Sequence, residues 1–186
     1  MKKRIVILLI VIVSAINCLA QFEDEKPSIR DRLFFGGGFG LAFGSVTHVD
    51  VSPLVGYKIT NRFSAGIGLS YQYYKYAAYN IKTSIYGAKV FTSFTIIKDL
   101  GNILPFGENM GAIMLHAELE GLNLEKRIFY LSSDDGREWI VTPLAGIGYS
   151  LPVGQRSFLN IYLLYNFNES SKSPYQNPVF RMSLQF

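Results

Sequence analysis

From Leu33 to its last residue, the chain repeats short segments in which bulky apolar side chains alternate with small or polar ones. A period of two places successive side chains on opposite faces of a β-strand. In the last segment, Phe180, Met182, Leu184 and Phe186 fall on one face. Turn-forming residues separate the segments. The pattern predicts eight strands, over 33–43, 48–59, 63–73, 86–96, 113–131, 139–151, 159–167 and 179–186.

The fifth segment is the least regular. Ile113, Leu115, Ala117 and Leu119 share one face, but the alternation loses its phase near 121–123. An extra residue in one strand shifts the faces in this way, so we expect a β-bulge there.

The connections between the strands roughly alternate between short and long. Turns are expected over 60–62, 98–109 and 152–156, and loops over 44–48, 74–82, 132–137 and 168–178. An even number of strands brings both termini to one side, which we expect to be the periplasmic side of a Gram-negative outer membrane.

The direction of the alternation favours a barrel in lipid over a soluble sandwich. Arg or Lys on the lipid face near the bilayer midplane costs ~2–4 kcal/mol, and the outward positions of the regular alternation carry no charged residue. Segments of about ten residues suit tilted membrane strands. The sequence therefore predicts an all-β fold, an eight-stranded antiparallel up-and-down transmembrane β-barrel. The strand charges fall on the opposite, inward face, at Asp50, Lys58, Lys89, Glu118, Glu120 and Arg181.

The N-terminal region has the pattern of a secretory signal peptide. Lys2, Lys3 and Arg4 precede an apolar run that is too short for a spanning helix, and Ala20 ends the segment. We expect a signal peptide over 1–20, a periplasmic lead-in over 21–31 and the barrel domain over 32–186. Acylation of Cys18 remains an alternative to cleavage after Ala20.

Charge and cysteine content limit the partners. Loss of the three basic residues of the leader lowers the formal net charge from +4 to about +1. A nearly neutral chain gives no reason to expect a nucleic-acid partner. The lone cysteine also lies in the leader, so the mature barrel has none, as suits an oxidising envelope compartment.

The inward charges suggest a network in the barrel interior. Glu118 and Glu120 face the axis, where Lys89 and Arg181 can meet them, and His116 lies on the same face. The interior of an eight-stranded barrel is just wide enough for side chains to fill it, and buried charges must be paired. We therefore expect a plug of ion pairs without an open pore. No second His or Cys stands at metal-ligand spacing from His116, so no metal and no cofactor are expected.

Two further groups are candidates for surface chemistry. A concentration of tyrosines around the second predicted loop could bind a glycan or a protein, because Tyr offers contact area at low entropic cost. Ser45, His48 and Asp50 could form a nucleophilic set at the outer rim, although nothing in one strand fixes their distances. The candidate loop-binding residues are Tyr73, Tyr74, Tyr76 and Tyr79.

Three stretches resemble small outer-membrane barrels of the OmpA and OmpX type, and more closely the outer-membrane β-barrel proteins of Bacteroidota-like bacteria. They are the Phe34-Phe35-Gly36-Gly37-Gly38-Phe39-Gly40 opening, the hairpin over 56–64, and the ending over 177–186. The resemblance implies a barrel in the outer membrane, in contact with its lipid. It also implies that Phe180, Leu184 and Phe186 carry the signal read by the barrel-assembly machinery.

The expected function is non-enzymatic, without catalytic residues: a structural or surface-interaction barrel that acts through its extracellular loops. One alternative is a lipid-modifying acyltransferase or esterase that uses His48. Another is a secreted, soluble barrel of the lipocalin type. The sequence does not identify a ligand.

Overall fold

The computed structural model describes residues 28–42, 46–76, 81–103, 107, 109–126, 136–168, 170 and 173–186. Leu33–Phe186 forms one compact unit and Met1–Arg32 another. In the latter, the described part is one helical turn, α2 (Ile29–Arg32). The predicted signal peptide, 1–20, and most of the lead-in, 21–31, lie outside the described residues. No described helix is long and apolar enough to cross a membrane.

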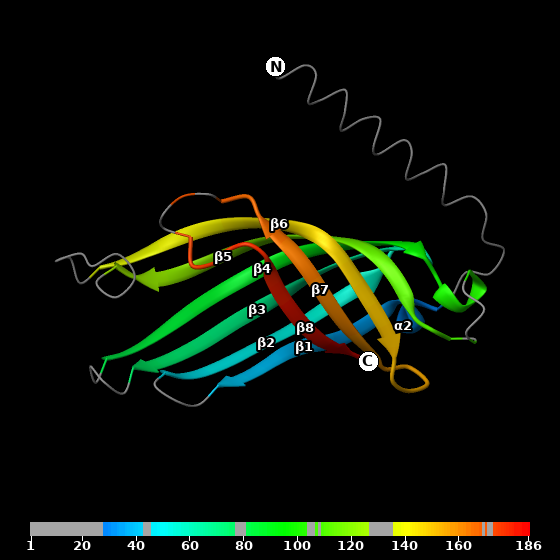
Figure 1. The fold of residues 1–186 in the computed structure, drawn as a ribbon, viewed down its shortest axis with the longest axis horizontal. Coiled ribbons are helices and arrows are strands. Elements are labelled where there is room, and N and C mark those ends of the chain that lie inside the picture. The colour runs from blue at the N-terminus through cyan, green and yellow to red at the C-terminus, as the bar shows by residue number, and fades with distance from the viewer. Residues whose placement is uncertain are drawn as a thin grey trace, which may run out of the picture. The chain divides into compact units, whose positions relative to one another are not determined.

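The second unit is a closed antiparallel barrel (Figure 1). Each strand pairs with the next along the chain, and the last pairs with the first. The predicted all-β, eight-stranded, up-and-down fold is confirmed. Its strands are β1 (Leu33–Ala42), β2 (Val46–Lys58), β3 (Phe63–Tyr76), β4 (Ile81–Ile97), β5 (Ala112–Glu125), β6 (Arg137–Pro152), β7 (Phe158–Asn166) and β8 (Val179–Gln185).

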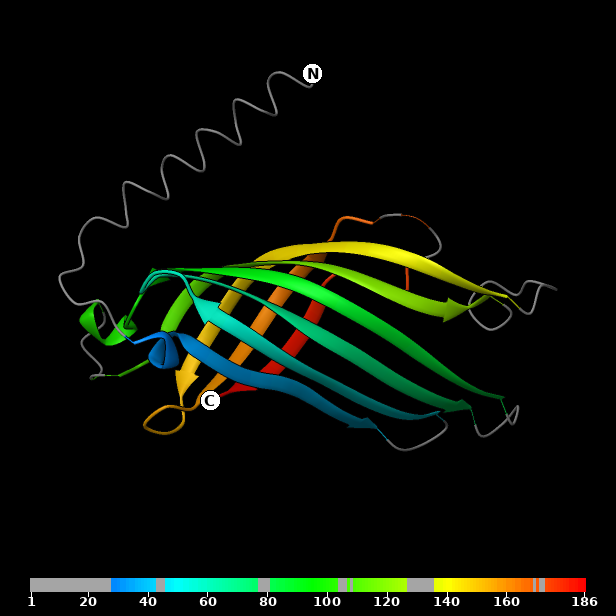
Figure 2. The ribbon, with the colours of Figure 1, turned by 180° about the vertical axis from the view of Figure 1, so that it is seen from behind.

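We call the end of the barrel where β1 begins and β8 finishes the near end, and the opposite end the far end. The near end carries the connections β2–β3, β4–β5 and β6–β7, and the far end carries the other four. In Figure 1 the near end is on the right, and in Figure 2 it is on the left.

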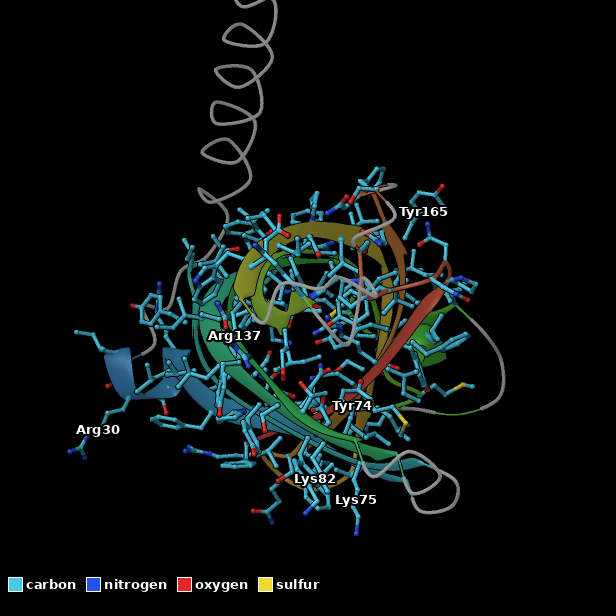
Figure 3. The ribbon with its side chains drawn as sticks, turned by 90° about the vertical axis from the view of Figure 1, so that its left-hand side faces the viewer. Arg30, Tyr74, Lys75, Lys82, Arg137 and Tyr165 are labelled. Atoms are coloured by element: carbon cyan, nitrogen blue, oxygen red, sulfur yellow. The ribbon has the colours of Figure 1, made fainter. Side chains whose placement is uncertain are left out.

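The outer face of the barrel is a band of exposed apolar side chains, as the alternation predicts. Phe39 is 69% exposed, Leu69 63% and Phe180 71%. Viewed from the far end, Tyr165, Lys75 and Lys82 point away from the barrel axis, and the two lysines mark the far rim (Figure 3). Other exposed members of this band are Ile67, Val90, Leu115, Leu119, Val141, Ile147, Leu163, Met182, Leu184 and Phe186.

The second predicted loop, 74–82, is largely strand. β3 continues to Tyr76 and β4 begins at Ile81, with Tyr74 opposite Thr83 and Lys75 opposite Lys82. Polar residues occupy both faces of this extension, so the hydrophobic alternation fades while the backbone ladder continues. The same reason places Arg137 in β6, although it was expected in a loop, and starts β2 at Val46, before the predicted strand start at His48.

The expected bulge at 121–123 is absent from the described ladder. Gly121 pairs with Ala88 on one side and Val141 on the other, without a shift. The irregularity in this pair of strands lies instead between Thr95 and Ile97 of β4. The alternation looked out of phase because Leu122 and Leu124 are apolar and point inward, where both are fully buried.

The seam that closes the barrel, between β1 and β8, is short. Gly36 pairs with Gln185 and Gly37 with Leu184, and Phe35 and Phe186 exchange two backbone hydrogen bonds of 2.9 and 2.8 Å. At Gly36 the backbones approach so closely that a Cβ atom would overlap the carbonyl oxygen of Leu184. The glycine-rich opening of the barrel therefore makes this crossing of strands sterically possible.

Candidate functional site: the charged belt and cavity inside the barrel

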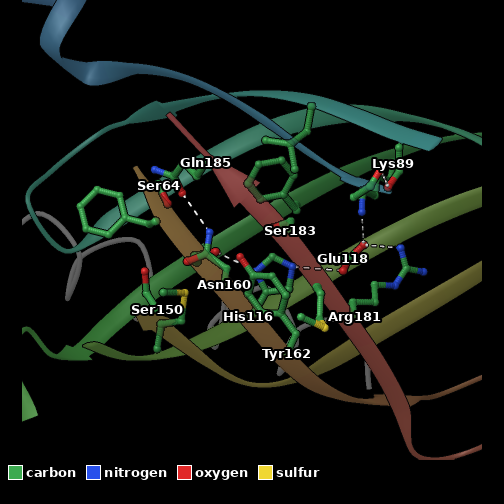
Figure 4. Close-up of a pocket in the computed structure, with 18 of the residues that line it drawn as sticks. Ser64, Lys89, His116, Glu118, Ser150, Asn160, Tyr162, Arg181, Ser183 and Gln185 are labelled. Carbon is green, nitrogen blue, oxygen red and sulfur yellow. Dashed lines mark hydrogen bonds and ion pairs between the residues drawn. The ribbon is translucent and has the colours of Figure 1, made fainter. Parts of the chain in front are cut away.

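A belt of charged side chains crosses the middle of the barrel interior. The Glu118 carboxylate lies 3.2 Å from Lys89 Nζ and 3.4 Å from Arg181 Nη1 (Figure 4). These residues come from β5, β4 and β8, so the ion pairs link strands on different sides of the barrel. Charges this deeply buried are tolerated only when they are paired.

Glu120, fully buried, forms the second centre of the belt. Its carboxylate lies 2.5 Å from Arg181 Nη2 and accepts hydrogen bonds from Ser70 Oγ at 2.8 Å and Tyr175 Oη at 2.7 Å. Arg181 therefore bridges both glutamates. The structure brings together the interior residues suggested by the sequence, Lys89, His116, Glu118, Glu120 and Arg181.

Tyr175 enters the belt from the β7–β8 connection rather than from a strand. Asn166 and Asn177 hold that segment: Asn177 Oδ1 accepts from the Asn166 backbone N–H at 2.6 Å, and Asn177 Nδ2 donates to the Asn166 carbonyl at 3.0 Å. The Tyr175 ring lies under the Arg181 guanidinium, 5.2 Å from it, and packs against buried apolar clusters. The described part of this loop thus places the Tyr175 side chain inside the barrel.

Beyond the belt, the far half of the interior is filled with apolar side chains. Ile85, Leu122, Leu124 and Ile140 form one buried cluster, against which Tyr74 and Tyr175 pack. This half matches the expected side-chain-filled interior.

The rest of the interior differs from that expectation, because it holds a cavity of about 680 Å³ that is lined by residues of all eight strands and reaches Tyr74 and Tyr175. Its size follows from the small inward residues of β1–β3, among them Gly38, Ser52 and Ser64. The expectation assumed side chains of ordinary volume on every strand. Cations stand at the near-end mouth, at Lys58, Arg62 and Lys98.

His116 lies where the belt meets this cavity. Its Nδ1 is 2.7 Å from Ser93 Oγ, and its Nε2 is 3.2 Å from Glu118 Oε1. The ring stacks on Phe91 at 5.7 Å and packs against Tyr162 at 4.2 Å between centroids. Glycine at 148 leaves room for the Tyr162 ring, which a Cβ there would meet at 2.7 Å. Two polar contacts and two ring contacts thus fix the position of the His116 side chain.

The tyrosine patch does not form a loop surface in the described part of the chain. Tyr73 and Tyr74 belong to β3, and Tyr74 Oη donates to Gln72 Oε1 at 3.2 Å while its ring packs on the far apolar cluster. Figure 3 shows Tyr74 directed towards the interior. The side chain of Tyr76 and all of Tyr79 lie outside the described residues.

The set of Ser45, His48 and Asp50 is not assembled by what the structure describes. Ser45 and the His48 side chain lie outside the described residues, and Asp50 lines the cavity. Within the described residues, no group of three His, Cys, Asp or Glu side chains is arranged to hold a metal ion. Phe180, Leu184 and Phe186 are exposed on the outer face; the structure does not test their role in assembly.

Sequence reasoning missed Ser70, Ser93 and Tyr175. Ser93 stands directly opposite His116 in the β4–β5 register, so the correct pairing would have identified it. No pattern in the sequence indicates that Tyr175 lies in the interior, because its position depends on the path of a loop.

The turn between β4 and β5 is organised by Asp99 at the near end. Its carboxylate accepts backbone N–H bonds from Gly101 and Met110 at 2.9 Å and from Asn109 at 3.0 Å. The hydrogen bond from Gly101 is the largest influence and favours the ionised form. Burial acts next and in the opposite direction, but with the bonds from Asn109 and Met110 the net result is an Asp99 pKa below its usual value. Asp99 also caps the short 3-10 helix η3 (Leu100–Asn102).

Comparison with solved structures finds similarity to the N-terminal β-barrel domain of Pseudomonas aeruginosa OprF. The match covers 83% of this chain and 94% of that domain, with 15% identical residues and a TM-score of 0.49. No protein-family model and no curated protein matches the sequence.

Proposed function

We propose that this chain is an integral outer-membrane barrel, with both termini periplasmic, that has a structural or surface-interaction role through its far-end loops. The observation that carries the proposal is the band of exposed apolar side chains around the whole barrel. Hydrocarbon favours such a face, whereas water opposes it. The charged residues that cross the middle of the barrel all point inward.

The soluble, lipocalin-type alternative requires the opposite arrangement. A barrel in water places its bulky apolar residues inside and its charges outside. Here Phe39, Leu69 and Phe180 are outside, and Lys89 and Glu118 are inside. This difference supports membrane lipid as the surrounding medium. In that medium Phe180, Leu184 and Phe186 would also present the signal for the assembly machinery.

The filled far half supports a barrel without a steady pore. Ion passage would require a path past the apolar cluster and Tyr175, then across a belt whose glutamates are already paired. In planar bilayers, the purified barrel should show no large steady conductance, and Tyr175→Ala should raise it. Steady conductance of the unaltered barrel would contradict a closed interior.

Fractionation tests the location. The chain should require detergent for extraction from the outer-membrane fraction and should migrate differently on a gel before and after boiling, as closed barrels do. Release from cells without detergent would refute the membrane assignment.

Single cysteines test the orientation. Ser170→Cys and Gly154→Cys place exposed thiols at the far and near ends. A membrane-impermeant maleimide added to intact cells should label the far-end thiol and leave the near-end thiol unlabelled until the membrane is opened. The reverse pattern would overturn the orientation.

A further inference from the structure

Ser93, His116 and Glu118 form a continuous chain of polar contacts from β4 to β5. Ser93 Oγ is 2.7 Å from His116 Nδ1, and His116 Nε2 is 3.2 Å from Glu118 Oε1. A carboxylate only accepts hydrogen bonds, so this geometry assigns the ring hydrogen to Nε2 and leaves Nδ1 to accept the Ser93 hydroxyl. That is the order of nucleophile, base and orienting acid.

The base and the acid are held in place by their surroundings. Phe91 and Tyr162 fix the plane of the His116 ring, while Lys89 and Arg181 hold Glu118 through its other oxygen, Oε2. Glu118 Oε1 therefore remains directed at His116. Because the side chains of this relay are already fixed, little conformational entropy is lost when they act on a substrate.

The three residues also face available space. All of them line the 680 Å³ cavity, a volume within the range of sites for small molecules. Ser64 lies directly opposite Ser93 on β3 and lines the same cavity. Lys89 reaches Glu118 at the other end of the relay (Figure 4). The Ser64 hydroxyl stands across the ladder from Ser93, and a hydroxyl in that place can stabilise an oxyanion.

We propose that Ser93 is a nucleophile activated by His116, and that the barrel cleaves small esters that enter its near-half cavity. Ser93 Oγ forms a bond to the ester carbonyl carbon while its proton passes to His116 Nδ1. The carbon–oxygen bond to the alcohol then breaks, and His116 returns the proton to the leaving alkoxide. In the second step His116 Nδ1 takes a proton from water, and the hydroxide oxygen forms a bond to the acyl carbon. The bond from that carbon to Ser93 Oγ then breaks, and His116 returns the proton to Ser93 as the acid leaves. Glu118 supports the positive charge that His116 carries between these transfers.

The lining indicates which ester fits. Phe34, Phe158 and Met114 offer apolar contact, and Lys58 and Lys98 stand at the mouth. A short acyl chain on an alcohol that carries a negative charge matches both features.

A small ethyl fluorophosphonate probe tests the proposal on the folded, detergent-solubilised barrel. Ser93 should displace fluoride and become labelled, with the site located by peptide mass spectrometry. Ser150 is the matched control, since it lines the same cavity and both serines are 8% exposed. Ser70 is a second control, because it bonds to a carboxylate without an imidazole. Labelling at Ser93 should be ~10²-fold faster than at either control.

His116→Gln should reduce Ser93 labelling to the rate of Ser150, while heat-modifiable migration shows that the barrel still closes. With p-nitrophenyl acetate, the unaltered barrel should release a burst of one nitrophenolate per chain. Ser93→Ala should abolish the burst, and Ser157→Ala, outside the cavity lining, should preserve it. Equal labelling of Ser93 and Ser150, no labelling at all, or a burst that survives Ser93→Ala would each overturn the proposal. These outcomes are independent of where the barrel resides.

Discussion

The two halves of the barrel interior share one frame of strands but differ in what fills them. In the far half, Leu122, Leu124 and Ile140 belong to one buried apolar cluster, and Tyr175 packs against it from a loop. In the near half, glycine and serine replace such residues on β1–β3, and a cavity remains. The difference shows that inward side-chain volume, rather than strand number alone, decides whether a small barrel is filled or hollow.

Arg181 lies at the boundary between the halves, and its loss should have the largest effect. Arg181→Ala leaves Glu118 and Glu120 without their shared guanidinium, and removing one partner of a buried pair costs about 3–5 kcal/mol. Urea unfolding in lipid vesicles, followed by the fluorescence of the lone Trp139, measures the change. Lys75→Ala, at an exposed cation of the far rim, should change stability by less than about 0.5 kcal/mol. Equal effects of the two variants would mean that the belt does not stabilise the barrel.

The next largest effect is expected from truncating one apolar side chain in each half, which should destabilise the two halves by different amounts. Leu122→Ala removes a fully buried side chain from the filled half and should cost about 2–5 kcal/mol. Phe158→Ala, at the wall of the cavity, should cost less, because one side of that ring already faces open space. The same unfolding measurement compares them. A larger loss for Phe158→Ala would contradict the contrast between the halves.

The seam should respond to one added methyl group. Gly36→Ala places a Cβ atom on the Leu184 carbonyl, so the strands must separate, at a cost of about 1–3 kcal/mol. Gly121→Ala is the matched control, since its nearest neighbour would be 3.7 Å away in the Trp139 ring. The fraction of heat-modifiable barrel after refolding should fall for Gly36→Ala alone. Normal closure of that variant would show that the seam tolerates separation.

Alternation along the sequence was enough to predict the strands, their two faces and the members of the charged belt. Every second residue of a strand points inward, so position along the strand alone assigns a residue to the inside. It failed at Leu122 and Leu124, where apolar residues point inward and resemble a shift of phase. It also placed the end of β3 too early, because Lys75 stands on the outer face there and ends the apolar alternation.

Predicting the relay and the cavity requires information that the alternation of side chains along a strand does not contain. Ser93 and His116 meet only because the long β4–β5 turn sets one particular register between their strands. The cavity depends on the summed volume of eight inward faces. Tyr175 depends on how Asn166 and Asn177 fold a loop back into the barrel.

The smallest effect is expected at the mouth of the hollow half, where Asp99 is half-buried. The pKa of Asp99 is lower in the folded barrel than its usual value, so the ionised carboxylate stabilises the turn above about pH 4. This contribution is lost as the pH falls through the lower, folded-state pKa. Asp99→Asn should therefore speed amide hydrogen exchange at Gly101 and Met110 at pH 7, whereas buried strand amides near Leu122 keep their protection. Unchanged exchange at both turn amides would show that backbone pairing alone holds the mouth. Faster exchange that reaches Leu122 would instead couple the mouth to the filled half, and the two regions would then not be independent.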